Sequence, residues 1–249
     1  MILQRQLPDD MTGAHPLPGV APLDMRRWLA VDDAYAAQMR RRQELLRTHR
    51  AEVVAQLSDA DAAVHEALAL VVGTLSQQAG FDVTDHTVIC PDGRRVARRL
   101  PALEQICLIA QDDICILQKP LDAPEHLLSA AALCFPAGWK LSEKLGQPLR
   151  AIHDPVDDYT PDLARRVQRL FDGVRAGRPL WRFNRLWYSD PELFQPYKTD
   201  DLSEDEDAQR RAFCRSERQS IVRLPETGAV IFSIRTYVVH AKTARQQMS

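Results

Sequence analysis

The segment RSERQSIVRLP, residues 215–225, places acidic and basic side chains at alternating positions. If the segment is a β-strand, Arg215 and Glu217 share one face and Arg218 lies on the other. Arginine offers a planar pair of donors to a carboxylate or a phosphate, and glutamate can take up a proton beside a ligand. A cross-strand network of ion pairs on an exposed sheet explains the same pattern. The spacing alone therefore leaves both interpretations open.

A histidine suited to metal binding, His153, stands in the sequence AIHDPVDDY. Pro155 fixes its own φ angle and favours an extended conformation at Asp154, which predicts a rigid loop. Neutral imidazole is the commonest protein ligand of transition metals, and haem iron is often held by one histidine. Asp154 is a candidate to orient the imidazole ring. A hydrogen-bonded loop histidine without a ligand is the alternative interpretation.

Other common sites are missing from the sequence. The remaining six histidines show no HxxxH or HxH spacing, the five cysteines form no CxxC pair, and no glycine-rich phosphate loop occurs. Most of the cysteines lie in apolar runs, where a free thiol behaves as a small hydrophobe. This pattern predicts a reducing, cytoplasmic environment, with no zinc or iron–sulfur cluster within this chain.

Charge and hydropathy argue against two classes of partner. The formal net charge is −2, from 32 basic and 34 acidic residues, so the basic field typical of nucleic-acid binding is missing. The consecutive arginines Arg40, Arg41 and Arg42 are predicted to lie on a solvated helix face. No apolar run approaches the roughly 20 residues of a membrane span, and residues 1–19 lack the apolar core of a signal peptide. We expect no nucleic-acid partner and no membrane partner.

The elements that must position these residues follow from the hydrophobic pattern. Apolar stripes and capping residues predict helices at 31–50, 58–78, 139–145 and 161–176. Short apolar runs bounded by turn residues predict strands at 86–91, 105–109, 112–118 and 180–188. Residues 127–135 fit either a strand or a helix. Strands at 212–224 and 229–239, joined by a four-residue turn, predict a closing hairpin.

The last strand of this hairpin has two different faces. Its predicted core positions are Val230, Phe232, Ile234, Thr236 and Val238, and its mixed positions are Ile231, Ser233, Arg235 and Tyr237. This pattern suits a sheet with helices behind it and a ligand in front. Elsewhere, the proline-rich residues 1–25 predict an irregular arm on the surface, and the acidic residues 199–207 predict a mobile loop. Because no internal repeat or boundary is visible, we expect residues 1–249 to form a single domain.

Three segments of the chain, in conserved order over roughly its last two-thirds, resemble signature segments of the haem-dependent oxidative N-demethylase family. They are GWKLSEKLGQPLRAIHDPVDDY (138–159), RFNRLWYSDPELFQP (182–196) and RSERQSIVRLPETGAVIFSIRTYV (215–238). The segment QDDICILQK (111–119) resembles a further family strand more weakly. The last of the three segments is the most specific part of the match.

The resemblance implies an α+β, PAS-like fold, in which a curved antiparallel sheet with flanking helices encloses a haem b pocket. It also implies oxidation of a small methylated amine such as dimethylamine with O2, with release of formaldehyde. Electrons would come from partner reductase subunits that carry flavin and an iron–sulfur cluster. A non-catalytic PAS-like sensor that binds haem or another small ligand is the alternative function, because a fold alone does not decide activity.

The resemblance also implies roles for individual residues. It makes His153 the iron ligand and Glu217 a catalytic polar group near the substrate. The further cofactor-binding residues that it implies are Arg215, Arg218 and Arg235 for the haem propionates and Tyr237 for the pocket wall. The sequence departs from the family pattern at two places: Asp157 replaces a usual proline, and Arg185-Leu186 separates Asn184 from Trp187. Both departures fall near the expected pocket, so they affect the predicted substrate more than the predicted fold.

Overall fold

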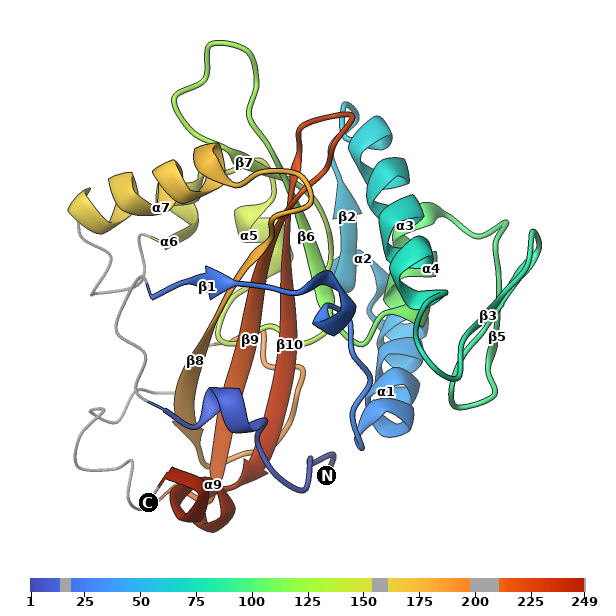
Figure 1. The fold of residues 1–249 in the computed structure, drawn as a ribbon, viewed down its shortest axis with the longest axis vertical. Helices are drawn as coiled ribbons and strands as arrows, with labels where there is room; N and C mark the ends of the chain where they lie inside the picture. The colour runs from blue at the N-terminus through green and yellow to red at the C-terminus, as the bar shows by residue number, and fades with distance from the viewer. Residues whose placement is uncertain (14–18, 154–160, 198–210, 249) are drawn as a thin grey trace.

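The computed structural model describes residues 1–13, 19–153, 161–197 and 211–248, with only the backbone at His153 and Pro161. Its centre is a seven-stranded antiparallel sheet in the order β1-β8-β9-β10-β6-β7-β2 (Figure 1). The strands are β1 (Ala21–Pro22), β2 (Val54–Gln56), β6 (Asp113–Gln118), β7 (Leu127–Ala132), β8 (Leu180–Tyr188), β9 (Phe213–Arg223) and β10 (Val230–His240). A small second sheet contains β3 (Asp82–Val83), β4 (Thr87–Ile89) and β5 (Arg95–Ala97).

Helices flank the large sheet, which confirms the predicted α+β architecture. They are α1 (Tyr35–Thr48), α2 (Arg50–Val53), α3 (Asp61–Leu75), α4 (Ala102–Ile109), α5 (Leu141–Lys144), α6 (Leu149–His153), α7 (Pro161–Gly173) and α9 (Ala241–Met248), with the 3-10 turns η1 (Asp9–Met11) and η2 (Met25–Arg27). Among the described residues, no helix is both long enough and apolar enough to cross a membrane.

The predicted closing hairpin is the longest strand pair of the sheet. β9 and β10 each contain eleven residues and pair along their whole length, from Val230 opposite Arg223 to His240 opposite Phe213. Their β-branched residues favour extended backbone, and the turn ends at Gly228, whose φ of 70° suits a residue without Cβ. β8 then pairs with the other edge of β9. The hairpin thereby fixes which side chains of three strands share a face.

One face of the sheet, here named the Glu217 face, carries Arg215, Glu217, Gln219 and Ile221 of β9 together with the residues directly opposite them on β8 and β10. Leu141 of α5, Leu149 of α6 and Phe171 of α7 pack against its apolar part, near Ile221 and Val230. This packing places the C-terminal end of α6, and therefore the backbone of His153, over the Glu217 face.

The opposite face, here named the Arg218 face, carries the even-numbered residues of β9. Met39 of α1, Val64 of α3 and Ile106 of α4 pack against its apolar part, which includes Val222 and Ile231. Figure 1 shows α1, α3 and α4 to one side of the central strands and α6 and α7 to the other. Both faces of the central strands are therefore covered, and Ile231, predicted to belong to an open ligand-facing side, is fully buried.

Two further predictions differ from the structure. Residues 105–109, predicted as a strand, belong to α4, because Leu103, Ile106, Cys107 and Ala110 repeat at helical spacing and are buried together. The N-terminal arm, predicted to be irregular and on the surface, contains η1 and β1 and buries Leu7 and Met11 completely. Gln4 holds this arm on β10, because its backbone N–H donates to Val238 O at 2.9 Å.

The prediction that Arg40, Arg41 and Arg42 lie on a solvated face of α1 is wrong for Arg42. Arg42 is fully buried, and its Nη2 donates to Asp113 Oδ1 at 2.6 Å. Asp113 also accepts the backbone N–H groups of Cys134 and Phe135, at 2.7 and 2.9 Å. A charged group inside a protein requires such a partner, so this contact ties α1 to β6 and to the end of β7.

Candidate functional site

A network of polar side chains on the Glu217 face holds the Glu217 carboxylate. Its Oε1 accepts from Arg215 Nε at 3.3 Å. Its Oε2 accepts from Asn184 Nδ2 at 3.1 Å and from Gln219 Nε2 at 3.3 Å. The side chain is only 10% exposed, so these three donors replace most of the water that an ionised carboxylate needs. The network fixes the direction of the Glu217 carboxylate.

Arg215 is held from the other side by backbone carbonyls. Its Nη1 donates to Leu193 O at 3.1 Å and its Nη2 to Phe135 O at 2.6 Å. The side chain is 1% exposed. The rigid guanidinium therefore links two distant loops to Glu217, and its position is set by the protein rather than by a ligand.

Arg182 of β8 supplies a second cation to the same network. Its Nη1 donates to Gln219 Oε1 at 2.7 Å, while its buried Nε has no hydrogen-bond partner among the described residues. Burial lowers the pKa of Arg182, against the opposing effect of the Glu217 carboxylate. A buried guanidinium nitrogen without an acceptor is costly, so this position favours an anionic or carbonyl oxygen from a ligand.

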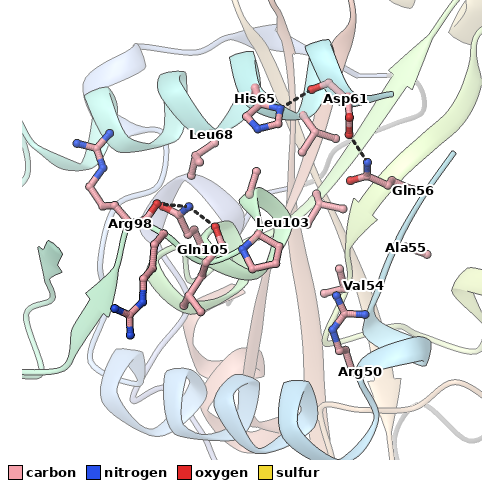
Figure 2. A pocket seen from close by; sticks show the side chains of 15 residues that line it. Arg50, Val54, Ala55, Gln56, Asp61, His65, Leu68, Arg98, Leu103 and Gln105 are labelled. Carbon is pink, nitrogen blue, oxygen red and sulfur yellow. Dashed lines mark hydrogen bonds between the residues drawn. The ribbon is translucent and has the colours of Figure 1, made fainter. Parts of the chain in front are cut away.

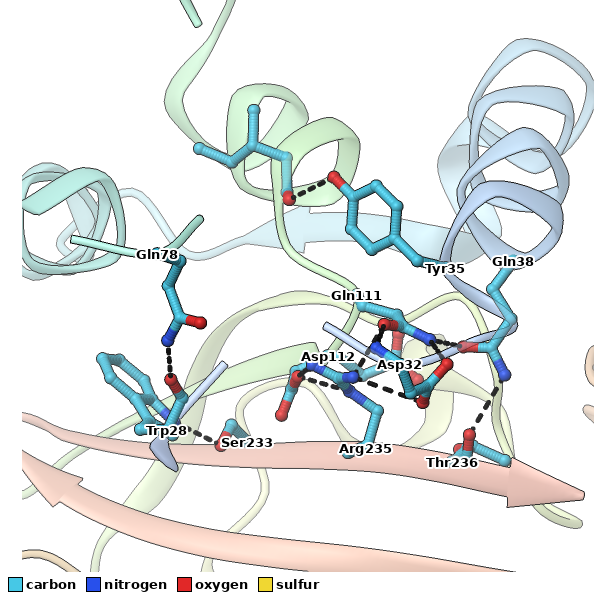
Figure 3. Close-up of polar contacts among 12 residues, drawn as sticks. Trp28, Asp32, Tyr35, Gln38, Gln78, Gln111, Asp112, Ser233, Arg235 and Thr236 are labelled. Atoms are coloured by element: carbon cyan, nitrogen blue, oxygen red, sulfur yellow. Dashed lines mark hydrogen bonds and ion pairs between the residues drawn. The ribbon is translucent and has the colours of Figure 1, made fainter. Parts of the chain in front are cut away.

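Arg235 lies on the Arg218 face and binds protein groups (Figure 3). Its Nε donates to Asp112 Oδ1 at 2.7 Å, and its Nη1 donates to Gln111 Oε1 at 2.7 Å. Burial alone would lower the pKa of Arg235, but the carboxylates of Asp112 and Asp32 raise it. These contacts join β10 to the segment before β6 and to the segment before α1. This structural network is buried, unlike the exposed cross-strand ion pairs that the spacing of residues 215–225 left as an alternative.

Arg218 and Tyr237 also lie on the Arg218 face. The Cζ atom of Arg218 lies 4.6 Å from the centre of the Trp181 ring, and within the described ranges the Nη2 atom of Arg218 has no hydrogen-bond partner. Burial raises the pKa of the Tyr237 hydroxyl. The structure therefore divides the predicted site residues between two faces: it brings Arg215 and Glu217 together and keeps Arg218, Arg235 and Tyr237 on the far side of the sheet.

The predicted iron ligand, His153, is the last residue of α6 rather than part of a loop. Its side chain lies outside the described residues, as do Asp154 and Asp157. The acidic segment 199–207 lies outside them as well. Ile152, the preceding residue, packs against the apolar cluster of the Glu217 face together with Leu180 and Trp139. The end of α6 and the network around Glu217 therefore adjoin the same cluster.

A separate pocket of about 670 Å³ lies between α3, β2 and α4 (Figure 2). It is lined by Arg50, Val54, Ala55, Gln56, Asp61, Val64, His65, Leu68, Arg98, Arg99, Leu100, Pro101, Ala102, Leu103 and Gln105. None of the predicted site residues lines it. Within the described ranges, no group of three or more His, Cys, Asp and Glu side chains is arranged to bind a metal ion.

Sequence reasoning missed Asn184 and Arg182 as members of the site. Strand alternation at 180–188 places both on one face, but it does not give the register of β8 against β9. The structure sets Asn184 opposite Glu217 and Arg182 opposite Gln219. The missing information was therefore the strand pairing, which depends on contacts far apart in the sequence.

A family model described as haem-dependent oxidative N-demethylase, alpha subunit-like, matches residues 19–249. The matched range contains both faces of the central sheet, α6 and all of the predicted site residues. No curated protein matches the chain.

Proposed function

The chain belongs to the haem-dependent oxidative N-demethylase, alpha subunit-like family, and on this premise we propose that it binds haem b and demethylates a small secondary amine. In the proposed reaction, dimethylamine, O2, two electrons and two protons give methylamine, formaldehyde and water. The match over residues 19–249 is the observation that carries this proposal. Haem, when bound, supplies the activation of O2.

The residues on the Glu217 face fit the chemistry that a haem requires. The backbone of His153 ends α6 next to Ile152, which packs with Leu180 and Trp139 in the apolar cluster of the Glu217 face, and the imidazole of His153 is the proposed iron ligand. The Nε of Arg182, which no described residue accepts from, is a charge-assisted donor suited to a propionate. We therefore assign the propionate contact to Arg182, with Arg215 behind it, and assign Arg218, Arg235 and Tyr237 to the opposite side of the sheet.

Glu217 is proposed to bind the amine. Three donors hold its carboxylate in place, and one of its lone-pair directions stays available to an N–H group. A secondary ammonium ion would donate to that oxygen, which orients the N-methyl group towards the proposed haem. Arg215 and Asn184 act through Glu217 by fixing its position. The proposed electron donor is a partner subunit with flavin and an iron–sulfur cluster, and the proposed location is the cytoplasm.

Haem binding is tested first, by the absorption spectrum of the protein purified after expression with added iron. We expect a Soret band, which His153→Ala abolishes or shifts because the substitution removes the iron ligand. His65→Ala, on the exposed surface of α3, is the control and should leave the spectrum unchanged. A His153→Ala spectrum identical to that of the wild type would remove His153 from the ligand role.

Turnover is tested with dimethylamine, O2 and an added electron donor, by measuring O2 uptake and released formaldehyde in equal amounts. Glu217→Gln should reduce kcat/KM by roughly a hundredfold, because it removes the charge that binds the ammonium ion. Its Soret band should remain. Haem bound in the wild type without formaldehyde release would instead support the non-catalytic sensor.

A further inference from the structure

Two cysteines on different elements lie in contact inside the core. Cys107 belongs to α4 and Cys134 follows β7, and their Sγ atoms are 3.3 Å apart. Both residues are fully buried, and both thiols are free. Sulfur atoms this close need to approach by only about 1 Å to reach the roughly 2.05 Å of a disulfide bond. The pair has no role in the proposed demethylation.

The surroundings favour reaction at one of the two sulfur atoms. The buried guanidinium of Arg42 binds Asp113, yet its Nε and Nη1 have no hydrogen-bond partner in the part of the chain that the structure describes. The hydrogen bond from Cys134 lowers the pKa of Cys107, burial opposes this change, and the positive charge of Arg42 supports it. Burial raises the pKa of Cys134. Cys107 is thus the better nucleophile, and Cys134 is the thiol that resolves the product.

We propose that Cys107 and Cys134 form an oxidisable dithiol, which hydrogen peroxide converts into a disulfide. The Cys107 thiolate attacks one peroxide oxygen, the O–O bond breaks, and a sulfenic acid and hydroxide form. The sulfur of Cys134 then displaces the sulfenic oxygen, which leaves as water, and the S–S bond forms. Overall, two thiols and one peroxide give one disulfide and two water molecules, so the sulfur atoms are oxidised and the peroxide is reduced.

A small oxidant reaches this buried dithiol more readily than a large one. Hydrogen peroxide is close to water in size, whereas aromatic disulfide reagents are much larger. Because both sulfur atoms are fully buried, oxidation requires local opening of the core and is slow compared with that of an exposed thiol. A bulky reagent should therefore react with the folded protein more slowly still.

Oxidation at Cys134 is coupled by direct contacts to the Glu217 network. Asp113 binds the N–H groups of Cys134 and Phe135 at 2.7 and 2.9 Å. The carbonyl of Phe135 in turn accepts from Arg215 Nη2 at 2.6 Å. A displacement of Cys134 therefore reaches the guanidinium that holds Glu217. Only an effect on catalysis rests on the proposed function; the thiol chemistry does not.

The cross-link is tested on the whole wild-type protein treated with hydrogen peroxide, quenched, denatured and alkylated. We expect free thiols to fall from five to three, a mass decrease of two hydrogen atoms before alkylation, and a peptide joining Cys107 to Cys134. Dithiothreitol should restore all five thiols. Five unchanged thiols, a cross-link between other cysteines, or stable oxygen adducts without a cross-link would each overturn the proposal.

Matched variants separate the pair from the other buried cysteines. Cys107→Ala and Cys134→Ala should prevent the cross-link, while Cys115→Ala, whose side chain packs on the Glu217 face, should retain it. If an alanine variant fails to fold, the wild-type peptide map still decides. The coupling of the dithiol to the Glu217 network is measured in a separate experiment, by amide hydrogen exchange in β9. The exchange rate should change on oxidation. An unchanged β9 in the cross-linked protein would overturn the coupling.

Discussion

Asn184 of β8 and Glu217 of β9 lie directly opposite each other and are joined by two hydrogen bonds of opposite direction. Asn184 Nδ2 donates to the carboxylate at 3.1 Å, and the backbone N–H of Glu217 donates to Asn184 Oδ1 at 3.0 Å. The amide side chain therefore anchors both the main chain and the side chain of Glu217. Only a group with a donor and an acceptor at its tip makes both contacts.

The first prediction compares two substitutions of this asparagine. Asn184→Ala should lower the free energy of unfolding by about 1 kcal/mol, because it removes hydrogen bonds from a half-buried site. Asn184→Asp should lower it further at neutral pH, since a second carboxylate then faces Glu217. Like charges raise the pKa of one carboxyl in the folded state, so this extra loss is absent at acidic pH and grows as pH rises. Urea unfolding at several pH values measures it.

Equal stability of these two variants at neutral pH would contradict the first prediction. Gln219→Ala is the control for the pH dependence, because it removes the contacts of Gln219 with Glu217 and Arg182 without adding a charge beside Glu217. We expect its effect to be independent of pH near neutrality.

The second prediction concerns the buried ion pair of Arg42 and Asp113. Asp113→Ala should lower the free energy of unfolding by about 3–5 kcal/mol, because it leaves Arg42 charged in the core. It also removes the acceptor of two backbone N–H groups, those of Cys134 and Phe135. Arg41→Ala, on the same helix, is the control. Arg41 makes partly exposed ion pairs with Glu44 and Glu192, so its loss should cost about 1 kcal/mol or less in urea unfolding.

The third prediction is a pH dependence at the turn of the closing hairpin. Glu66 of α3 accepts from the N–H groups of Glu226 and Thr227, at 2.7 and 2.8 Å, and from the Thr227 hydroxyl at 2.6 Å. Burial alone would raise the pKa of Glu66, but these hydrogen bonds outweigh it and lower the pKa below the ordinary 4.5. A lowered pKa in the folded state stabilises the protein above that ordinary value, and the stabilisation is lost as pH falls through the folded pKa.

Glu66→Gln should therefore lower the Tm by about 2 °C at neutral pH and by less as the pH falls below about 4.5. Thermal unfolding followed by circular dichroism measures the difference. Glu52→Gln, at an exposed position of α2, should show no difference at any pH. A Glu66→Gln effect that is as large in acid as at neutral pH would contradict the assigned cause.

The closing hairpin and β8 were predictable because their signals are local. Strand alternation continues through residues 213–223 and 230–240, and Gly228 closes the turn between them. The helix α4 was mispredicted as a strand because the short apolar run at its end hides the helical spacing that begins at Leu103. The length of the segment and Pro101 at the N-cap of α4 were the better evidence for a helix.

The partners of the buried arginines were not predictable, because they lie far away in the sequence. Arg42 binds a carboxylate 71 residues away, and Arg215 binds a carbonyl 80 residues away. Local charge patterns therefore favoured a solvated face for Arg42. The two faces of β9 were separated correctly by alternation, whereas the resemblance to a family assigned residues of both faces to one cofactor. Strand pairing and helix packing show that Arg218 and Arg235 lie opposite to Glu217.

The last prediction uses Arg182 to distinguish a ligand contact from a structural one. In the ligand-free protein, Arg182→Leu should lower the free energy of unfolding by only about 1 kcal/mol, because it removes one hydrogen bond, from Nη1 to Gln219, while Nε has no partner to lose among the described residues. Haem affinity should nevertheless fall about tenfold, which corresponds to the loss of one charge-assisted hydrogen bond of about 1.4 kcal/mol. Urea unfolding and haem titration measure the two quantities.

Arg223→Leu is the matched control, because Arg223 also lies on the Glu217 face but its guanidinium binds protein carbonyls. Arg223 Nε, Nη1 and Nη2 donate to the carbonyls of Val174, Gly228 and Phe171, each at 2.6 Å. Its substitution should therefore destabilise the ligand-free protein by about 2 kcal/mol or more and change haem affinity little. If Arg182→Leu destabilised the protein as strongly as Arg223→Leu and left haem affinity unchanged, Arg182 would be a structural residue. The propionate contact proposed on the Glu217 face would then have to come from another cation.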